Sequence, residues 1–156
     1  MTIDDYRSHI RQYPATEAYL NRRVRELAER FGIPREVFER LAALEDQETI
    51  FVGTPEVMEF DAVRPMRRGI RLARVYPYSL KPTTFGMQVL GGQATRNVID
   101  VTDEQAKLLI NGGALNTAVK ANNGFVLIRW RGLVVGVGYY KRPVLKSQIP
   151  RFRPVE

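Results

Sequence analysis

The sequence predicts an α+β fold, with helices first and then mostly strands around one embedded helix. Apolar residues recur at helical spacing before residue 46, whereas short apolar runs of strand character dominate from Thr49 onward. The charge changes as well: residues 1–60 carry 8 basic and 12 acidic residues, and residues 61–156 carry 16 and 5. We therefore predict a small α/β N-terminal region over 1–65 and a second domain over 66–156.

The N-terminal region is predicted to contain two helices followed by short strands. "TEAYLNRRVRELAERFG" places apolar residues on one helical stripe, with Thr16 as N-cap and Gly32 as the stop. The next segment, "IPREVFERLAALED", begins with Pro34 at a first-turn position and continues with a second stripe. "ETIFVGTPEVMEF" then predicts one or two short strands around a Gly-Thr-Pro turn.

The second domain is predicted from strand, loop and helix signals in turn. "GIRLARVYPYSL" indicates a strand, "KPTTFG" a loop, and "MQVLGG" and "NVIDV" two short strands. In "TDEQAKLLINGG", Thr102 and Gln105 match a capping box and Gly112 is a helix stop. "GFVLIRW" and "LVVGVGYYK" predict a hairpin around Arg131-Gly132, and the proline-containing end "RPVLKSQIPRFRPVE" is predicted to be extended.

The strand "LVVGVGYYKR" raises a question because it carries two glycines, two residues apart. Alternation puts Gly136 and Gly138 on the face of Val134 and Tyr140, which leaves a bare strip of backbone there. Such a strip indicates that a ligand or another part of the protein comes close.

Several function classes are disfavoured by the composition. There is no cysteine and only one histidine, His9, which argues against thiolate chemistry, the usual catalytic triads and structural zinc. The glycine-rich pieces fit neither a phosphate-binding loop nor a dinucleotide fingerprint. No apolar run has the length of a membrane span and the charged N-terminus does not match a signal peptide, so we expect a cytoplasmic protein without a cofactor or metal.

The basic second part favours a polyanion as partner, and RNA is the commonest such partner. Residues 120–156 interleave basic residues with aromatic ones, and Glu156 is their only acid. Arginine and lysine contact phosphates while aromatic faces stack on unpaired bases. Solubility remains an alternative explanation of the charge, and Tyr140 suits a core position as well as a ligand contact.

In order, the helix "TDEQAKLLINGGAL", the strand "GFVLIRW" and the Gly-x-Gly strand "LVVGVGYYK" resemble a PUA domain, a small RNA-binding pseudo-barrel. The continuation "VLKSQIPR" is similar to the C-terminal region of Sun/Fmu-type RNA cytosine-5 methyltransferases, over roughly residues 69–156. The resemblance implies a PUA-like β-barrel with one embedded helix, and RNA recognition without the cysteine-dependent catalysis of those enzymes. It also implies that RNA backbone enters a groove between the embedded helix and the barrel strands.

The candidate RNA-binding residues come from this groove, from the basic C-terminal part and from the loop around Lys81. They are Lys81, Thr83, Gly112, Gly113, Arg129, Gly136, Gly138, Tyr140, Lys141, Arg142, Lys146 and Arg151. For the glycines, close packing of the helix on the barrel is the alternative explanation. A solvated loop is the alternative for Lys81, while Arg71 and Arg74 are weaker candidates.

The expected function is therefore non-catalytic RNA binding, on ribosomal RNA or its precursors, in ribosome biogenesis or RNA modification. One alternative is a protein-interaction subunit that supplies RNA recognition to a separate RNA methyltransferase or another ribosome-assembly protein, docked through the acidic N-terminal helices. An unrecognised enzyme, with a displaced carboxylate pKa in a deep pocket, is the least favoured alternative.

Overall fold

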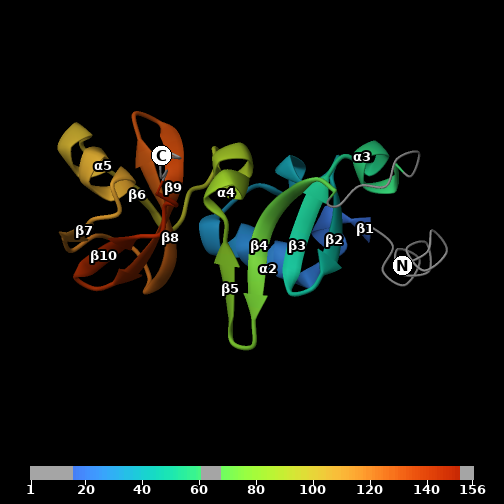
Figure 1. The fold of residues 1–156 in the computed structure, drawn as a ribbon, viewed down its shortest axis with the longest axis horizontal. Helices are drawn as coiled ribbons and strands as arrows, with labels where there is room; N and C mark the ends of the chain where they lie inside the picture. Colours follow the sequence, from blue (N-terminus) through green and yellow to red (C-terminus); the bar gives the residue numbers. More distant parts are fainter. Residues whose placement is uncertain (1–15, 61–67, 152–156) are drawn as a thin grey trace, which may run out of the picture.

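The computed structural model describes residues 16–60 and 68–151, so His9, Phe152 and Arg153 lie outside the described residues. The fold is mixed α/β, with two five-stranded sheets of order β1-β2-β3-β4-β5 and β6-β8-β9-β10-β7. Figure 1 shows the sheets toward opposite ends of the long axis, with α4 (Thr84–Leu90) between them.

The first sheet is antiparallel throughout and follows the order of the chain. It comprises β1 (Thr16–Glu17), β2 (Ala42–Asp46), β3 (Thr49–Gly53), β4 (Ile70–Tyr76) and β5 (Ser79–Pro82). The short helix α3 (Pro55–Glu59) follows β3 and is capped by the side chain of Thr54. A bulge between Ile50 and Phe51 shifts the register between β3 and β4.

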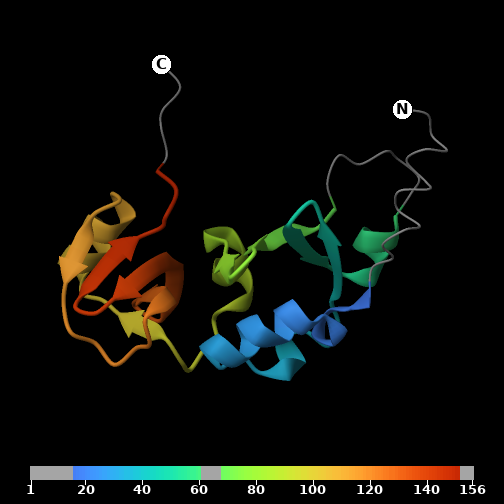
Figure 2. The same ribbon diagram turned by 90° about the horizontal axis from the view of Figure 1, so that it is seen from below.

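Helix α2 (Arg22–Phe31) lies along one face of this sheet (Figure 2). Its buried residues are Val24, Leu27, Ala28 and Phe31, so most of the predicted apolar stripe is confirmed. Leu20 is not part of it, because it lies in the 3₁₀ helix Ala18–Leu20 and is exposed. The predicted N-cap is also wrong: Asn21 accepts the backbone N–H groups of Arg23 and Val24, while Thr16 is in β1.

The second predicted helix is replaced by the 3₁₀ helix Arg35–Val37 and by strand β2. Phe38 of the predicted apolar stripe is buried, as expected. Residues Ala42–Asp46, however, form a strand that pairs with β1 on one side and β3 on the other. The ladder hydrogen bonds of a central strand here prevail over the helix propensity of "RLAALED".

Strand β4 pairs with β3, and β5 pairs with β4, so both belong to the first sheet and not to the barrel part predicted over 66–156. The change of sheet falls between Pro82 and Val98. Within this interval the predicted loop and strand are corrected to α4, whose N-cap is Thr83. Thr83 accepts a hydrogen bond from Gly86 N, which is a local signal for a helix start inside "KPTTFG".

The second sheet forms a half-barrel in the part of the chain that resembled a PUA domain. It contains β6 (Val98–Asp100), β7 (Ala114–Asn116), β8 (Gly124–Trp130), β9 (Leu133–Lys141) and β10 (Val144–Ser147). Only the β6–β8 pair is parallel. The hairpin around Arg131-Gly132 is confirmed, and the predicted extended end includes strand β10.

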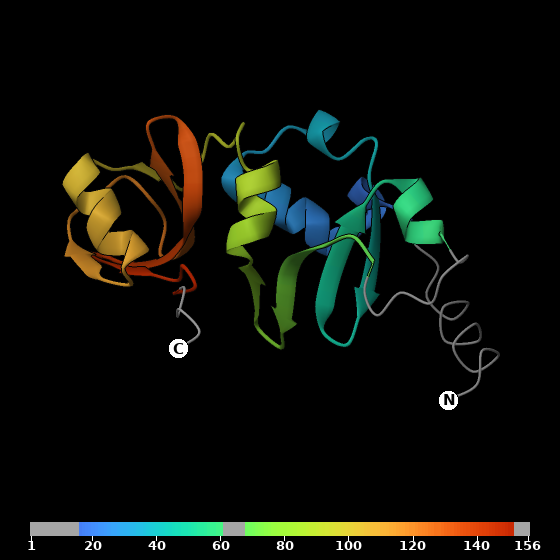
Figure 3. The ribbon, with the colours of Figure 1, turned by 45° about the horizontal axis from the view of Figure 1, so that its top comes forward.

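The embedded helix is α5 (Asp103–Ile110), and the predicted Thr102–Gln105 capping box is present. Figure 3 shows α5 on the side of the second sheet that is remote from the first sheet. Helix α4 lies on the opposite side, where it contacts both β9 and β4.

One hydrophobic core joins the two sheets. Phe31 and Met87 belong to the same buried cluster as Leu127, Val134 and Val137 of the second sheet. A smaller core, which contains Leu109, Ile128, Tyr140 and Leu145, lies within the half-barrel. The largest core is therefore built by both halves of the chain.

Candidate nucleic-acid interface

The hairpin of β9 and β10 presents three exposed cations beside an aromatic ring. Lys141, Arg142 and Lys146 are exposed, and with Tyr139, Pro143 and Val144 they line a cavity of about 360 Å³. Lys146 pairs with Tyr139 across the ladder, and Lys141 lies two residues after Tyr139 on β9. The side chains of Tyr139, Lys141 and Lys146 therefore lie on the same face of the hairpin. The described lining contains no carboxylate.

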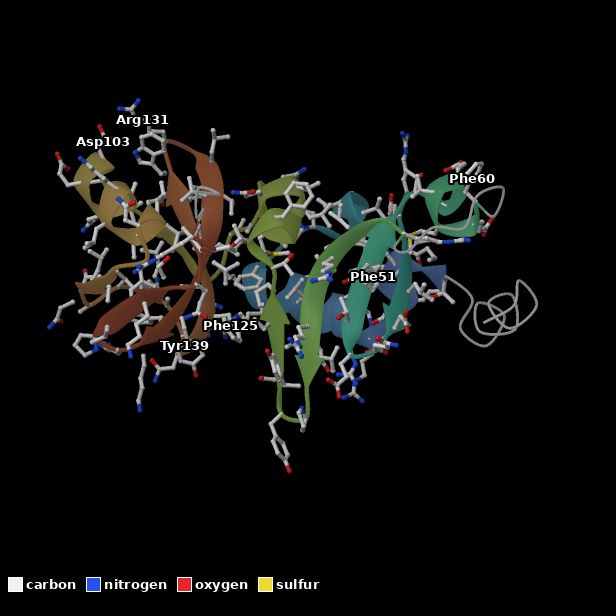
Figure 4. The ribbon with its side chains drawn as sticks, in the orientation of Figure 1. Phe51, Phe60, Asp103, Phe125, Arg131 and Tyr139 are labelled. Atoms are coloured by element: carbon white, nitrogen blue, oxygen red, sulfur yellow. The ribbon has the colours of Figure 1, made fainter. Side chains whose placement is uncertain are left out.

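Tyr139 is 42% exposed and packs edge-on against Phe125, with ring centroids 5.1 Å apart and an interplanar angle of 81°. Figure 4 shows the two rings together at the side of β8 and β9 that faces the β4–β5 hairpin. Sequence reasoning selected the neighbouring tyrosine instead. The signal that identifies Tyr139 is its position two residues before Lys141, on the same face of the strand.

Tyr140, one of the candidate RNA-binding residues, is a core residue, which corrects that prediction. Its side chain is fully buried. The hydroxyl accepts a hydrogen bond from the backbone N–H of Val119 at 3.1 Å and donates one to the carbonyl of Thr117 at 3.3 Å. A buried tyrosine whose hydroxyl is satisfied by backbone groups is not available to stack on a base.

The two strand glycines are covered by other parts of this chain. A Cβ atom on Gly136 would lie 2.7 Å from Cδ1 of Ile149, and one on Gly138 would lie 2.7 Å from Cδ1 of Leu145. The open strip predicted from the glycines is therefore absent. Close packing accounts for both positions, but the packing groups are Ile149 and Leu145 and not the embedded helix of the alternative explanation.

The glycines at the end of α5 are also in contact with side chains of the protein. Gly112 has φ +82°, and a Cβ there would lie 2.6 Å from Nη2 of Arg151. A Cβ on Gly113 would lie 2.6 Å from Cδ1 of Leu108. The guanidinium of the exposed Arg151 thus lies beside Gly112 at the end of the helix.

Arg129, another candidate, is held in an ion pair. Its Nε and Nη2 donate to the two carboxylate oxygens of Asp100 at 2.7 and 3.0 Å, and Nη1 donates to the carbonyl of Ala94 at 3.4 Å. The hydrogen bonds with Asp100 raise the pKa of Arg129, and those with Arg129 lower the pKa of Asp100. The pair uses the forked face of the guanidinium that a phosphate would need.

A second carboxylate that is hydrogen-bonded to an arginine lies at the start of α5. Asp103 accepts hydrogen bonds from Nε1 of Trp130 at 2.7 Å and from Nη2 of Arg131 at 2.9 Å. The hydrogen bonds from Arg131 first, and then from Trp130, lower the pKa of Asp103. Figure 4 places Asp103 and Arg131 at the far side of the second sheet from Tyr139.

The candidates in the first sheet are separate from the basic hairpin. Lys81 is on β5 and pairs with Arg74 of β4, so both side chains lie on one face of the first sheet. The side chain of Thr83 is engaged in capping α4. The sequence-predicted residues therefore do not form one site, and the accessible basic cluster among them is Lys141, Arg142 and Lys146.

Arg30 connects α2 to the half-barrel beside this cluster. Its Nε donates to the carbonyl of Phe125 at 2.9 Å, and Nη2 donates to the carbonyls of Asn122 and Asn123 at 3.3 Å. Desolvation by burial lowers the pKa of Arg30, while Tyr139 acts in the opposite direction. Sequence reasoning assigned no role to Arg30, because its partners are backbone carbonyls more than 90 residues away.

Within residues 16–60 and 68–151, no group of three or more His, Cys, Asp or Glu side chains is arranged to hold a metal ion. Over the same residues, no helix combines the length and apolar character needed to cross a membrane.

The half-barrel, with its embedded helix and exposed basic hairpin, is the kind of module that the sequence resemblance predicted. Residues 96–153 match the family model of the methyltransferase RsmF PUA domain. This part of the chain is thus a PUA-like domain similar to the C-terminal region of the Sun/Fmu-type proteins, and the match supports RNA binding. No curated protein matches the chain.

Proposed function

We propose that this protein binds RNA through the basic β9–β10 hairpin and acts as a recognition module without catalysis. The observation that carries the proposal is the cavity lined by Lys141, Arg142, Lys146 and Tyr139, whose described lining has no carboxylate. Ammonium and guanidinium groups bind phosphates, and an exposed aromatic ring suits an unpaired base.

The three cations are suited to the RNA backbone because the hairpin holds them at the surface without a described ion-pair partner in the protein. The described ion pairs involve Arg22, Arg23, Arg129 and Arg131, and none includes the hairpin cations. The backbone N–H of Arg142 donates to Oδ1 of Asn123 at 3.1 Å, which fixes the turn between the strands. A phosphate at this hairpin therefore does not have to displace a described carboxylate partner.

The non-catalytic part of the proposal rests on the composition. Cytosine-5 methyltransferases of the resembled type use a cysteine nucleophile, and this chain contains no cysteine. The resemblance to the Sun/Fmu-type C-terminal region points to ribosomal RNA or its precursors as the ligand, in ribosome biogenesis or RNA modification. A cytoplasmic location fits this ligand.

Binding of the full chain to total ribosomal RNA, and to a scrambled RNA of equal length, at two salt concentrations tests the proposal. We expect affinity to fall with salt with a log–log slope of about −0.7 per phosphate contact on single strands. Ribosomal RNA should keep an advantage at the higher salt. Absence of binding to either RNA would refute the function.

Arg142→Glu should weaken binding strongly while leaving the stability nearly unchanged. Arg40→Glu is the matched control, because it makes the same change of charge at an exposed residue of the first half. Equal losses of affinity in the two variants would show a non-specific charge effect and would remove the hairpin from the site.

A second candidate function is that of a subunit that supplies RNA recognition to a separate methyltransferase. The surface of helix α3 favours this second function. The side chains of Val57 and Phe60 are 49% and 53% exposed, and they lie beside the carboxylates of Glu56 and Glu59. Exposed apolar groups among carboxylates are suited to a protein partner. A complex that persists after nuclease treatment would support this function.

A further inference from the structure

We infer that the bound RNA is single-stranded and that one unpaired base enters a cavity between the two halves of the chain, where it stacks on Tyr139. This site rests on the RNA binding proposed above and adds the first half of the protein to the recognition surface. It lies next to the basic hairpin and away from the helix-and-strand groove expected from the family resemblance.

The cavity has a volume of about 350 Å³ and is built by three parts of the fold, namely a helix and two strand pairs. Helix α2 contributes the stretch around Leu27 and Arg30, the β4–β5 hairpin contributes Tyr78 to Leu80, and β8 and β9 contribute Phe125 and Tyr139. Its volume lies within the range of small-ligand sites, which suits a group of the size of a nucleobase.

Tyr139 lines both this cavity and the one formed by the basic hairpin. A nucleotide has the same division into a flat apolar base and a charged phosphate. With its base on the cavity side of Tyr139, the nucleotide would extend its phosphate toward Lys141 and Lys146 on the other side. The two adjacent cavities therefore fit one nucleotide and its backbone better than two unrelated ligands.

The charges of the cavity favour an uncharged group within it. Glu26 is the carboxylate of the described lining, and its Oε1 accepts a hydrogen bond from Nε of Arg22 at 3.1 Å. Arg30 has its Nε and Nη2 engaged by backbone carbonyls. A carboxylate repels a phosphate but accepts hydrogen bonds from the amino groups of a base.

The aromatic walls are arranged for stacking. Phe125 supports the Tyr139 ring edge-on, which holds the ring in place while leaving 42% of the residue exposed. Tyr78 is fully exposed at the turn between β4 and β5 and forms part of the rim. Base-paired RNA keeps its bases inside the helix, so stacking in this cavity requires a single strand.

The test uses the full chain and a short single-stranded RNA that carries one 2-aminopurine, whose fluorescence is quenched on stacking. Tyr139→Leu, which keeps the apolar bulk beside Phe125, should lower affinity by roughly 5- to 150-fold and abolish the quenching. Tyr139→Phe should retain both. The salt slope should stay unchanged in Tyr139→Leu, because no phosphate contact is lost.

Tyr78→Ala should lower affinity less than Tyr139→Leu but measurably, whereas Tyr76→Ala should not. Tyr76 is the matched control, being an exposed tyrosine on the same hairpin outside the cavity lining. A duplex of the same sequence should bind more weakly than the single strand.

The outcomes separate this inference from the proposed function. If Lys141→Ala weakens RNA binding but Tyr139→Leu binds and quenches like the wild type, the base site is refuted and the proposed function stands. Equal affinity for duplex and single strand would also refute the base site. If the wild-type chain binds no RNA, the proposed function and the base site both fail.

Discussion

Ile149 covers Gly136 so closely that a Cβ atom on this glycine would lie 2.7 Å from Cδ1 of the isoleucine. The segment that follows strand β10 thus returns over β9, and Ile149 covers the point where β9 has no side chain. The backbone N–H of Gln148, which donates to the carbonyl of Val137 at 2.9 Å, holds this segment in place. This packing explains Gly136, and the side chain of Leu145 in the same way explains Gly138.

Gly136→Ala should therefore destabilise the fold by about 1–3 kcal/mol, the usual cost of overpacking. Urea denaturation measures the change in the free energy of unfolding. Gly92→Ala is the control, because a Cβ there meets no described atom within 4 Å. A Gly136→Ala protein as stable as the wild type would show that Ile149 moves aside without cost.

Tyr140→Phe should lower stability without affecting RNA binding. The substitution removes the acceptor of the Val119 N–H and the donor to the Thr117 carbonyl. The expected loss is about 0.5–1.5 kcal/mol for a hydrogen bond, or somewhat more for the unpaired backbone group. Urea denaturation measures the stability of Tyr140→Phe and an RNA titration measures its affinity, with Tyr139→Phe as the control in both. Reduced RNA affinity in Tyr140→Phe alone would contradict the buried role of Tyr140.

Arg30→Ala should weaken the attachment of α2 to the half-barrel. It removes hydrogen bonds from a charged group to the carbonyls of Phe125, Asn122 and Asn123. We expect a loss of about 1.5–3 kcal/mol in the free energy of unfolding. Arg25→Ala changes an exposed arginine of the same helix and should cost little. Equal stability of the two variants would remove Arg30 from the connection.

The fluorescence of Trp130, the only tryptophan, should report the protonation of Asp103. Because the folded pKa of Asp103 is lowered by Arg131 and Trp130, the contribution of these contacts to stability is present above the unfolded pKa of about 3.9. It is lost as the pH falls through the lowered folded pKa. An acid titration should show this step in the wild type and not in Asp103→Asn. The same step in Asp103→Asn would assign it to another carboxyl.

Local signals predicted the elements whose determinants lie within a few residues. The capping box at Thr102 and Gln105 and the turn at Arg131-Gly132 are such cases, and the match over residues 96–153 confirms the PUA-like resemblance. Thr83 carries a comparable helix-start signal, although the pattern of this segment predicts a loop followed by a strand and the structure has helix α4 there.

Elements that depend on distant partners were predicted less well. Ala42–Asp46 has a helical pattern but becomes a strand between β1 and β3, and β4 joins a sheet that periodicity cannot identify. Tyr140 is buried and Tyr139 is 42% exposed, a difference that depends on which face of β9 the half-barrel core covers. For the same reason the ion pair of Arg129 with Asp100, 29 residues away, could not be anticipated from spacing.

The core shared by Phe31, Met87, Leu127, Val134 and Val137 bears on how the chain can be divided. Cutting at residue 96, where the family similarity begins, would expose Leu127 and Val137 to water. The limit of sequence similarity is thus not a limit of cooperative folding. The whole chain is expected to melt in one transition and to resist proteolysis between Leu90 and Val98, and a fragment beginning at residue 96 to associate through its uncovered apolar face.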